Sequence, residues 1–133
     1  MRRQEFELLV EKAIAALPPE FRERLDNVVI QVADRPTPEQ RREVGLGPDE
    51  DLFGLYEGRP LTVRDTNDPQ VRFPDRIWIF QGPIEQACDT RGQIVREIQD
   101  TVVHEIGHFF GLDEDEIGAI EAEYEYDDGE DRG

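Results

Sequence analysis

The pattern of apolar and polar positions predicts two main amphipathic helices. In residues 3–17, apolar side chains recur every three or four positions between charged ones, and Pro18 follows the pattern directly. Residues 93–110 form the longest such stretch, and Gly111 follows where many helices end in a left-handed residue. Shorter helical pieces are expected at residues 20–26, from Pro38 after a Thr37 cap, at 83–88, and at 114–124 after an Asp113–Glu116 capping box.

Runs of β-branched and aromatic residues predict the strands. The clearest runs are residues 28–33 and 76–80, and the first of them has the composition of a buried strand. Residues 52–57 form a third run, and residues 61–63 could return beside it as a hairpin partner. We therefore expect one α+β domain over residues 1–124, in which a small mixed sheet packs against the N-terminal helix and the longest helix.

The longest helix has an apolar side and a polar side. The apolar side and the flank beside it carry Ile98, Val102, Val103, Ile106, Phe109 and Phe110. We therefore expect the second half of this helix to be buried nearly all round. His104 and His108 share another face, which can line a cleft, and Glu105 sits between the two sides.

The negative charge of the chain argues against some classes of binding partner. The chain has 133 residues and a formal net charge of −17, which argues against nucleic acid and anionic membrane surfaces as partners. Eleven carboxylates and no Lys or Arg lie in residues 113–131, and we expect residues 125–133 to form an acidic C-terminal tail outside the domain. No apolar run approaches the length of a membrane span, and the start of the chain does not have the pattern of a signal peptide.

The single cysteine, Cys88, allows no intrachain disulfide. Together with the absence of a signal peptide pattern, this favours a reducing, cytoplasmic location. We expect Cys88 to be a buried or half-buried small residue. It is not expected to act as a nucleophile, because no histidine is available to activate it.

Both histidines of the chain lie in one short motif, in which His104, Glu105 and His108 read as HExxH. Positions i and i+4 of a helix share a face, so both imidazoles can reach one metal ion. Neutral imidazole is a good zinc ligand, and a carboxylate beside the open coordination position can accept a proton from the metal-bound water. We therefore expect His104 and His108 to bind Zn²⁺ and Glu105 to act as the general base.

A third ligand is expected shortly after the helix. Gly111 can adopt a positive φ at little cost and so permits the chain to turn back toward the metal. Glu114 follows at the tenth position after His104, with Asp113 before it and Asp115 after it. We favour Glu114 as ligand and Asp113 as cap, while Asp113, Asp115 or a residue elsewhere remain the alternatives. All three carboxylates would also suit the start of an acidic helix that binds no metal.

With these residues in place, the chain resembles the zincin metallopeptidases, and more narrowly the small bacterial zincin-like family. The segments that carry the resemblance are HEIGHFFG (104–111), the acidic residue at 114, the strand at 77–80, Pro83-Ile84-Glu85 and the upstream residues 52–58. The resemblance implies a minimal zincin-like domain and a zinc-dependent peptidase whose third ligand is Glu114, where the family commonly has aspartate. The methionine turn of the larger metzincins is absent, because the only methionine is Met1.

The resulting hypothesis is a zinc-dependent metallopeptidase that acts on a peptide or protein substrate. Residues 77–80 would be either the sheet edge to which an extended peptide adds or an ordinary structural strand. Tyr124 or Tyr126 could donate a hydrogen bond to the developing oxyanion, and packing of the last helix is their simpler role. The alternatives are an inactive zincin-fold protein that binds metal or a partner, and an acidic interaction module whose tail mimics nucleic acid.

Overall fold

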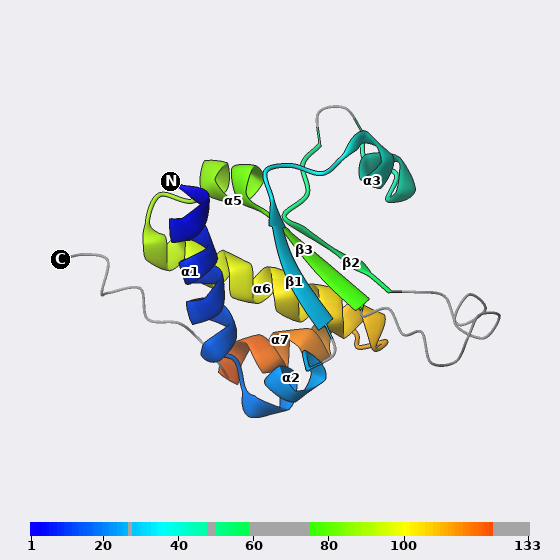
Figure 1. Ribbon diagram of the computed structural model, residues 1–133. Coiled ribbons are helices and arrows are strands. Elements are labelled where there is room, and N and C mark those ends of the chain that lie inside the picture. Colours follow the sequence, from blue (N-terminus) through cyan, green and yellow to red (C-terminus); the bar gives the residue numbers. More distant parts are fainter. Residues whose placement is uncertain (27, 48–49, 59–74, 124–133) are drawn as a thin grey trace, which may run out of the picture.

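Figure 1 shows the computed structural model of the chain, which describes residues 1–26, 28–47, 50–58 and 75–123. The elements in chain order are α1 (Arg3–Ala15), α2 (Pro19–Arg24), β1 (Val28–Ala33), α3 (Pro38–Glu43), β2 (Gly54–Glu57), β3 (Asp75–Phe80), α5 (Gln81–Ala87), α6 (Arg91–Phe109) and α7 (Glu114–Glu123). These bounds agree with the expected elements to within two residues at each end, and the α+β class is confirmed. The hairpin partner at 61–63, Tyr124, Tyr126 and the tail at 125–133 lie outside the described residues.

The three described strands form one mixed sheet in the order β1-β3-β2. β3 runs parallel to β1 and antiparallel to β2. The expectation that residues 77–80 could be a sheet edge is therefore wrong, since β3 is paired on both sides. The composition of β3 suits the central place, because Ile77, Ile79 and Phe80 are fully buried.

β1 differs from the predicted buried strand. Its residues alternate between half-buried and exposed over the first four positions, and Val29 is 38% exposed. The strand pairs with β3 on one side only among the described strands, and Val29 and Gln31, which share one face of the sheet, are exposed. A run of β-branched residues therefore did not distinguish a buried strand from a half-buried one.

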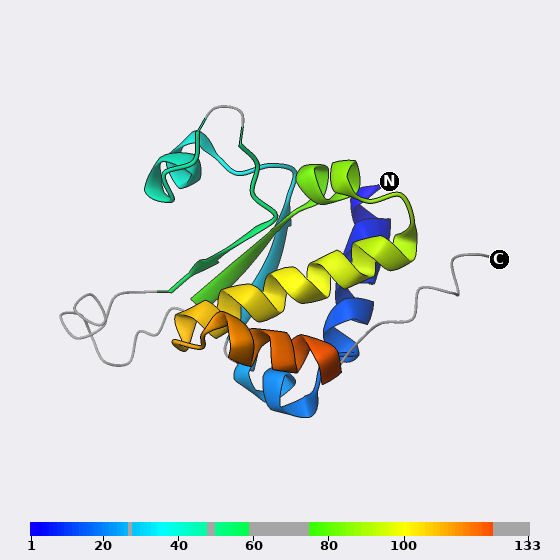
Figure 2. The same cartoon turned by 180° about the vertical axis from the view of Figure 1, so that it is seen from behind.

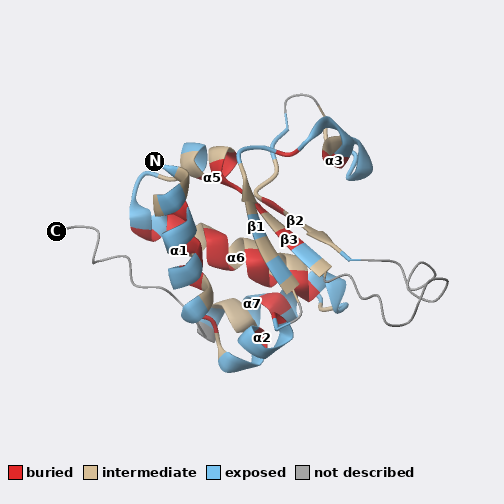
Figure 3. Cartoon of the chain, in the orientation of Figure 1, coloured by how far each residue is buried: buried red, intermediate tan, exposed pale blue. Residues whose placement is uncertain are grey.

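Helix α6 is the central helix of the domain. It contacts α1, α5, α7, β2 and β3. In Figure 2, α6 lies in front of the sheet and crosses the face that is turned toward the viewer. The predicted core residues Ile98, Val102, Val103 and Ile106 are buried, and Figure 3 shows buried segments recurring along α6. No described helix is long and apolar enough to cross a membrane.

The last turn of α6 extends beyond this core. Phe109 and Phe110, which were expected to be buried, are 48% and 50% exposed. The Phe109 ring stacks on Tyr56 with the centroids 4.2 Å apart, and the guanidinium of Arg24 lies 5.0 Å from the centre of the Phe110 ring. The prediction failed because the helical period gives the direction of a side chain but not where the packed core ends.

Candidate metal centre

Helix α6 carries both histidines, and local hydrogen bonds fix where it begins. The Thr90 hydroxyl accepts a hydrogen bond from the Gln93 N–H at 3.1 Å, and the Gln93 side chain accepts one from the Thr90 N–H at 3.2 Å. This capping box satisfies backbone donors that have no partner within the helix. One turn apart, His104 and His108 have their ring centroids 5.9 Å apart with the planes at 81°.

A backbone contact fixes the orientation of the His104 ring. Its Nδ1 lies 2.9 Å from the carbonyl oxygen of Asp100, one turn earlier in α6. A carbonyl oxygen can only accept, so in the neutral ring Nδ1 carries the proton and Nε2 keeps a free lone pair. Metal-binding histidines commonly have this arrangement, in which the second ring nitrogen donates to a carbonyl or a carboxylate.

The end of α6 turns the chain back toward the histidines. Gly111 has a φ of 77°, its N–H donates to the His108 carbonyl at 3.1 Å, and the Leu112 N–H donates to the Gly107 carbonyl at 2.8 Å. Together these bonds form a Schellman motif, in which glycine adopts the left-handed conformation without a steric penalty. The turn predicted at Gly111 is thereby confirmed.

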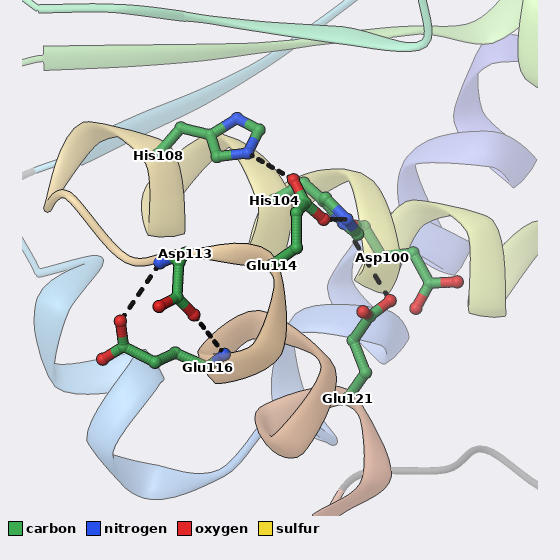
Figure 4. A network of polar contacts seen from close by, with 7 residues as sticks. All are labelled: Asp100, His104, His108, Asp113, Glu114, Glu116 and Glu121. Carbon is green, nitrogen blue, oxygen red and sulfur yellow. Dashed lines mark hydrogen bonds and ion pairs between the residues drawn. The ribbon is translucent and has the colours of Figure 1, made fainter.

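Gly107, inside the HExxH motif, allows α7 to approach α6 closely. A Cβ atom at this position would lie 2.8 Å from both Cγ1 and Cδ1 of Ile117, a residue that is fully buried. A real side chain would push the two helices apart. The glycine therefore lets the first turn of α7 lie beside the two histidines, as Figure 4 shows.

The carboxylates at the start of α7 have separate roles. Asp113 accepts a hydrogen bond from the Glu116 N–H at 2.8 Å, and Glu116 accepts one from the Asp113 N–H at 3.1 Å, so the predicted capping box is confirmed. Glu114 instead extends toward the histidines (Figure 4). One of its oxygens lies 3.1 Å from Nε2 of His108 and the other 3.6 Å from Nε2 of His104.

The donor set suits zinc. With bonds of about 2.0–2.2 Å and tetrahedral angles, two ligand atoms of a zinc ion lie about 3.4 Å apart, which falls between the two distances of Glu114. Within the described residues, no group of three or more His, Cys, Asp or Glu side chains is arranged so that it could hold a metal ion without moving. The Glu114 side chain is 73% exposed, so a change of its rotamer can bring the carboxylate to an ion held by the two histidines. Its role as a ligand stays a prediction.

Glu105 lies on the side of α6 that faces β2. Its Oε1 accepts a hydrogen bond from the backbone N–H of Tyr56 at 2.8 Å. Burial raises the pKa of Glu105 above its ordinary value, although the Tyr56 N–H and the two imidazoles act in the opposite direction. A raised pKa favours action as a general base near neutral pH, because proton transfer is most efficient when the pKa of the base is close to the working pH.

A group of carboxylates surrounds the other side of His104. Burial raises the pKa of Glu97, and the charge of Asp100 raises it further; the same two causes, in the same order, raise the pKa of Glu121. Burial would lower the pKa of His104, but the contact with the Asp100 carbonyl and the charges of Glu121, Glu114 and Asp100 raise it overall. This negative surrounding favours a cation at the imidazoles.

Cys88 has no sign of a catalytic role. It is half-buried, as expected. Burial raises the pKa of its thiol, and the charges of Glu97 and Asp89 raise it further. A raised pKa disfavours the thiolate, which is the nucleophilic form.

The roles of three groups near the site were not predicted from the sequence. The Tyr56 N–H is 49 residues away from Glu105, and no local pattern indicates the contact. The Asp100 carbonyl could have been noticed, because it lies one turn before His104 on the same helix. Gly107 also carried a signal, because glycine is unfavourable inside a helix and its presence there often indicates close packing.

Comparison with known proteins identifies a family for the chain. The chain matches the zincin-like metallopeptidase family over residues 25–124 of its 133 residues. None of the curated proteins compared with the chain matches it. The matched range includes the three described strands, the HExxH helix and α7, and this arrangement is the minimal zincin-like domain that the motif led us to expect. The chain therefore belongs to the family of zincin-like metallopeptidases.

Proposed function

We propose that the protein is a zinc-dependent peptidase in which His104, His108 and Glu114 hold the ion and Glu105 is the general base. The observation that supports this most is the position of the Glu114 carboxylate, 3.1 and 3.6 Å from the two Nε2 atoms. A zinc ion at this place would supply Lewis acidity, which polarises a carbonyl group and lowers the pKa of water.

Residues of the protein would then accept the proton of the water molecule and donate it to the leaving group. Glu105 accepts a proton from the attacking water and passes it to the leaving amine as the peptide bond breaks. Its raised pKa supports both transfers, because the carboxyl group can exchange a proton closer to neutral pH. The Asp100 carbonyl keeps the Nδ1 proton of His104 in place, so the ring binds the ion in one tautomer.

The proposed substrate is a peptide or protein in an extended conformation. β2, which pairs with β3 on one side only among the described strands, is the sheet edge that contacts α6. An extended chain could pair with this edge at positions other than Tyr56, whose N–H already donates to Glu105, and bring a carbonyl group toward the histidines.

Glu105→Gln tests the chemistry. This variant should keep stoichiometric zinc by elemental analysis and lose hydrolysis of an unstructured protein substrate. Glu39→Gln, which makes the same charge change at an exposed residue of α3, should retain full activity. Chelation should abolish cleavage by the wild-type protein, and added zinc should restore it. Normal cleavage by Glu105→Gln would show that the general base is another residue.

The second candidate is a catalytically inactive zincin-fold protein that binds metal or a partner. The exposed Glu114 side chain and the absence of a closed three-ligand group within the described residues favour it. Zinc content and chelator-sensitive cleavage, measured on the same preparation, separate the two candidates. A protein that holds zinc at full occupancy but cleaves no peptide would support the second one.

A further inference from the structure

Edge strand β2 and helix α6 meet along a row of contacts that we call the β2–α6 seam. Residues 54, 56 and 58, which are two positions apart, face residues of α6 that are four positions apart. Gly54 lies against Thr101, Tyr56 contacts Glu105 and Phe109, and Gly58, directly after β2, lies against Phe109. The match has a geometric reason. Two residues of a strand advance about 6.8 Å and four residues of a helix about 6.0 Å, so successive contacts stay in step.

The two glycines allow the strand to approach the helix. A Cβ atom on Gly54 would lie 2.4 Å from Cγ2 of Thr101 and 2.8 Å from the Trp78 carbonyl oxygen. A Cβ atom on Gly58 would lie 2.7 Å from Cε2 of Phe109. A side chain at Gly54 would therefore collide with the Trp78 backbone as well as with Thr101, and one at Gly58 would displace the Phe109 ring.

The central contact of the seam is the hydrogen bond from the Tyr56 N–H to Glu105. Because β2 is at the edge of the described sheet, this N–H is directed to a side chain of α6 and not to another strand. The Tyr56 side chain is fixed as well, since its hydroxyl donates to Asp75 at 2.8 Å and its ring stacks on Phe109. The donor is thus held on a strand whose position is set at several points.

We propose that the Tyr56 backbone N–H is a positioning group for Glu105, and that Phe109 holds β2 at the distance this contact requires. The backbone amide keeps the carboxylate on the β2 side of the histidines, oriented for proton transfer. The value of this contact for catalysis rests on the proposed function. The contact itself does not depend on it.

Amide hydrogen exchange on the metal-free protein tests the contact. Exchange at the Tyr56 amide should rise about tenfold in Glu105→Ala, the effect of losing one hydrogen bond to a charged group. Glu97→Ala removes a carboxylate from the same helix that does not accept the Tyr56 bond, and it should leave exchange at the Tyr56 amide unchanged. The Ile98 amide, in the buried middle of α6, serves as the reference for global opening. Unchanged exchange at Tyr56 in Glu105→Ala would overturn the proposal, whether or not the protein is a peptidase.

Two neighbouring phenylalanines provide a kinetic test. Phe109→Ala should lower kcat several-fold, leave KM and zinc content nearly unchanged, and speed exchange at the Tyr56 amide. Phe109→Tyr, which keeps the stacked ring, should restore kcat. Phe110→Ala removes a similarly exposed ring that packs edge-on against Phe109, and it should change these quantities far less than Phe109→Ala does. A rise in KM alone in Phe109→Ala would assign that ring to substrate contact and contradict a positioning role.

Discussion

The carboxylate of Glu114 lies 3.1 Å from Nε2 of His108, although α6 ends and the chain reverses between the two residues. This proximity depends on the Schellman turn at Gly111 and on the close approach of α7 at Gly107. The candidate metal centre is thus formed by one helix, its C-terminal turn and the first residue of the next helix.

Replacing Glu114 should weaken zinc binding more than replacing either neighbour. We expect Glu114→Ala to lower zinc affinity at least about 10–100-fold, the loss seen when even an outer-shell partner is removed. Asp115→Ala should bind zinc normally. Asp113→Ala should lose about 1 kcal/mol of stability through the helix cap and keep its zinc. Titration with zinc under chelator competition measures all three, and zinc loss confined to Asp113→Ala would make Asp113 the ligand.

Gly107→Ala should destabilise the protein and disturb the metal centre. Alanine gains about 1 kcal/mol of helix propensity over glycine, but overpacking against Ile117 typically costs about 1–3 kcal/mol, so a net loss of up to about 2 kcal/mol is expected. Zinc affinity should fall as well, because α7 moves away from the histidines. Urea unfolding and zinc titration check both effects.

Two variants make the Gly107 prediction specific. Ile117→Val removes one of the two carbons that the new Cβ would meet, so combining it with Gly107→Ala should recover part of the lost zinc affinity. Gly118→Ala, on α7, places its Cβ in open space and should stabilise the protein by about 1 kcal/mol. If Gly107→Ala were as stable as Gly118→Ala, close packing would not explain the glycine.

Glu97→Gln should stabilise the protein at neutral pH but not in acid. Burial and the charge of Asp100 raise the pKa of Glu97 in the folded state, so the folded protein binds this proton more tightly than the unfolded chain does. Ionisation of Glu97 therefore costs stability, and the cost grows as pH rises from the unfolded pKa through the raised folded pKa. Below the unfolded pKa the wild-type protein and the variant should unfold alike.

The control for this prediction is Glu7→Gln, which removes the same charge from an exposed position on α1. Melting temperatures of both variants and the wild-type protein, measured between pH 4 and pH 8, give the comparison. A gain in Glu97→Gln that grows with pH beyond the gain in Glu7→Gln is expected. Equal gains for the two variants would show that only the total charge matters.

Local patterns predicted the parts of this protein that local forces determine. The period of apolar residues located α6, and the spacing of Asp113 and Glu116 gave the cap of α7 because the two residues hydrogen-bond to each other directly. The spacing of four residues in the motif placed His104 and His108 on one face of α6, because positions i and i+4 of a helix lie one turn apart. Each of these features depends on residues a few positions apart.

Features that depend on distant residues were missed. Nothing near residues 77–80 indicates that β3 lies between two strands, because sheet order depends on the whole chain. The exposure of Phe109 depends on where other elements end, and the bond between Tyr56 and Glu105 spans 49 residues. The sequence patterns therefore predicted which side chains of the candidate site lie close together, but not how the sheet orients them.

The contact between Glu105 and Tyr56 also bears on self-association. An unpaired N–H on an edge strand can recruit a strand from another copy of the chain, and charged side chains at sheet edges prevent this pairing. Glu105 places a carboxylate on such an N–H. Variants that shorten this side chain to create an inactive, substrate-trapping protein, such as Glu105→Ala, remove this acceptor from the Tyr56 N–H. They should be more prone to aggregate than Glu105→Gln, whose amide oxygen can still accept the bond.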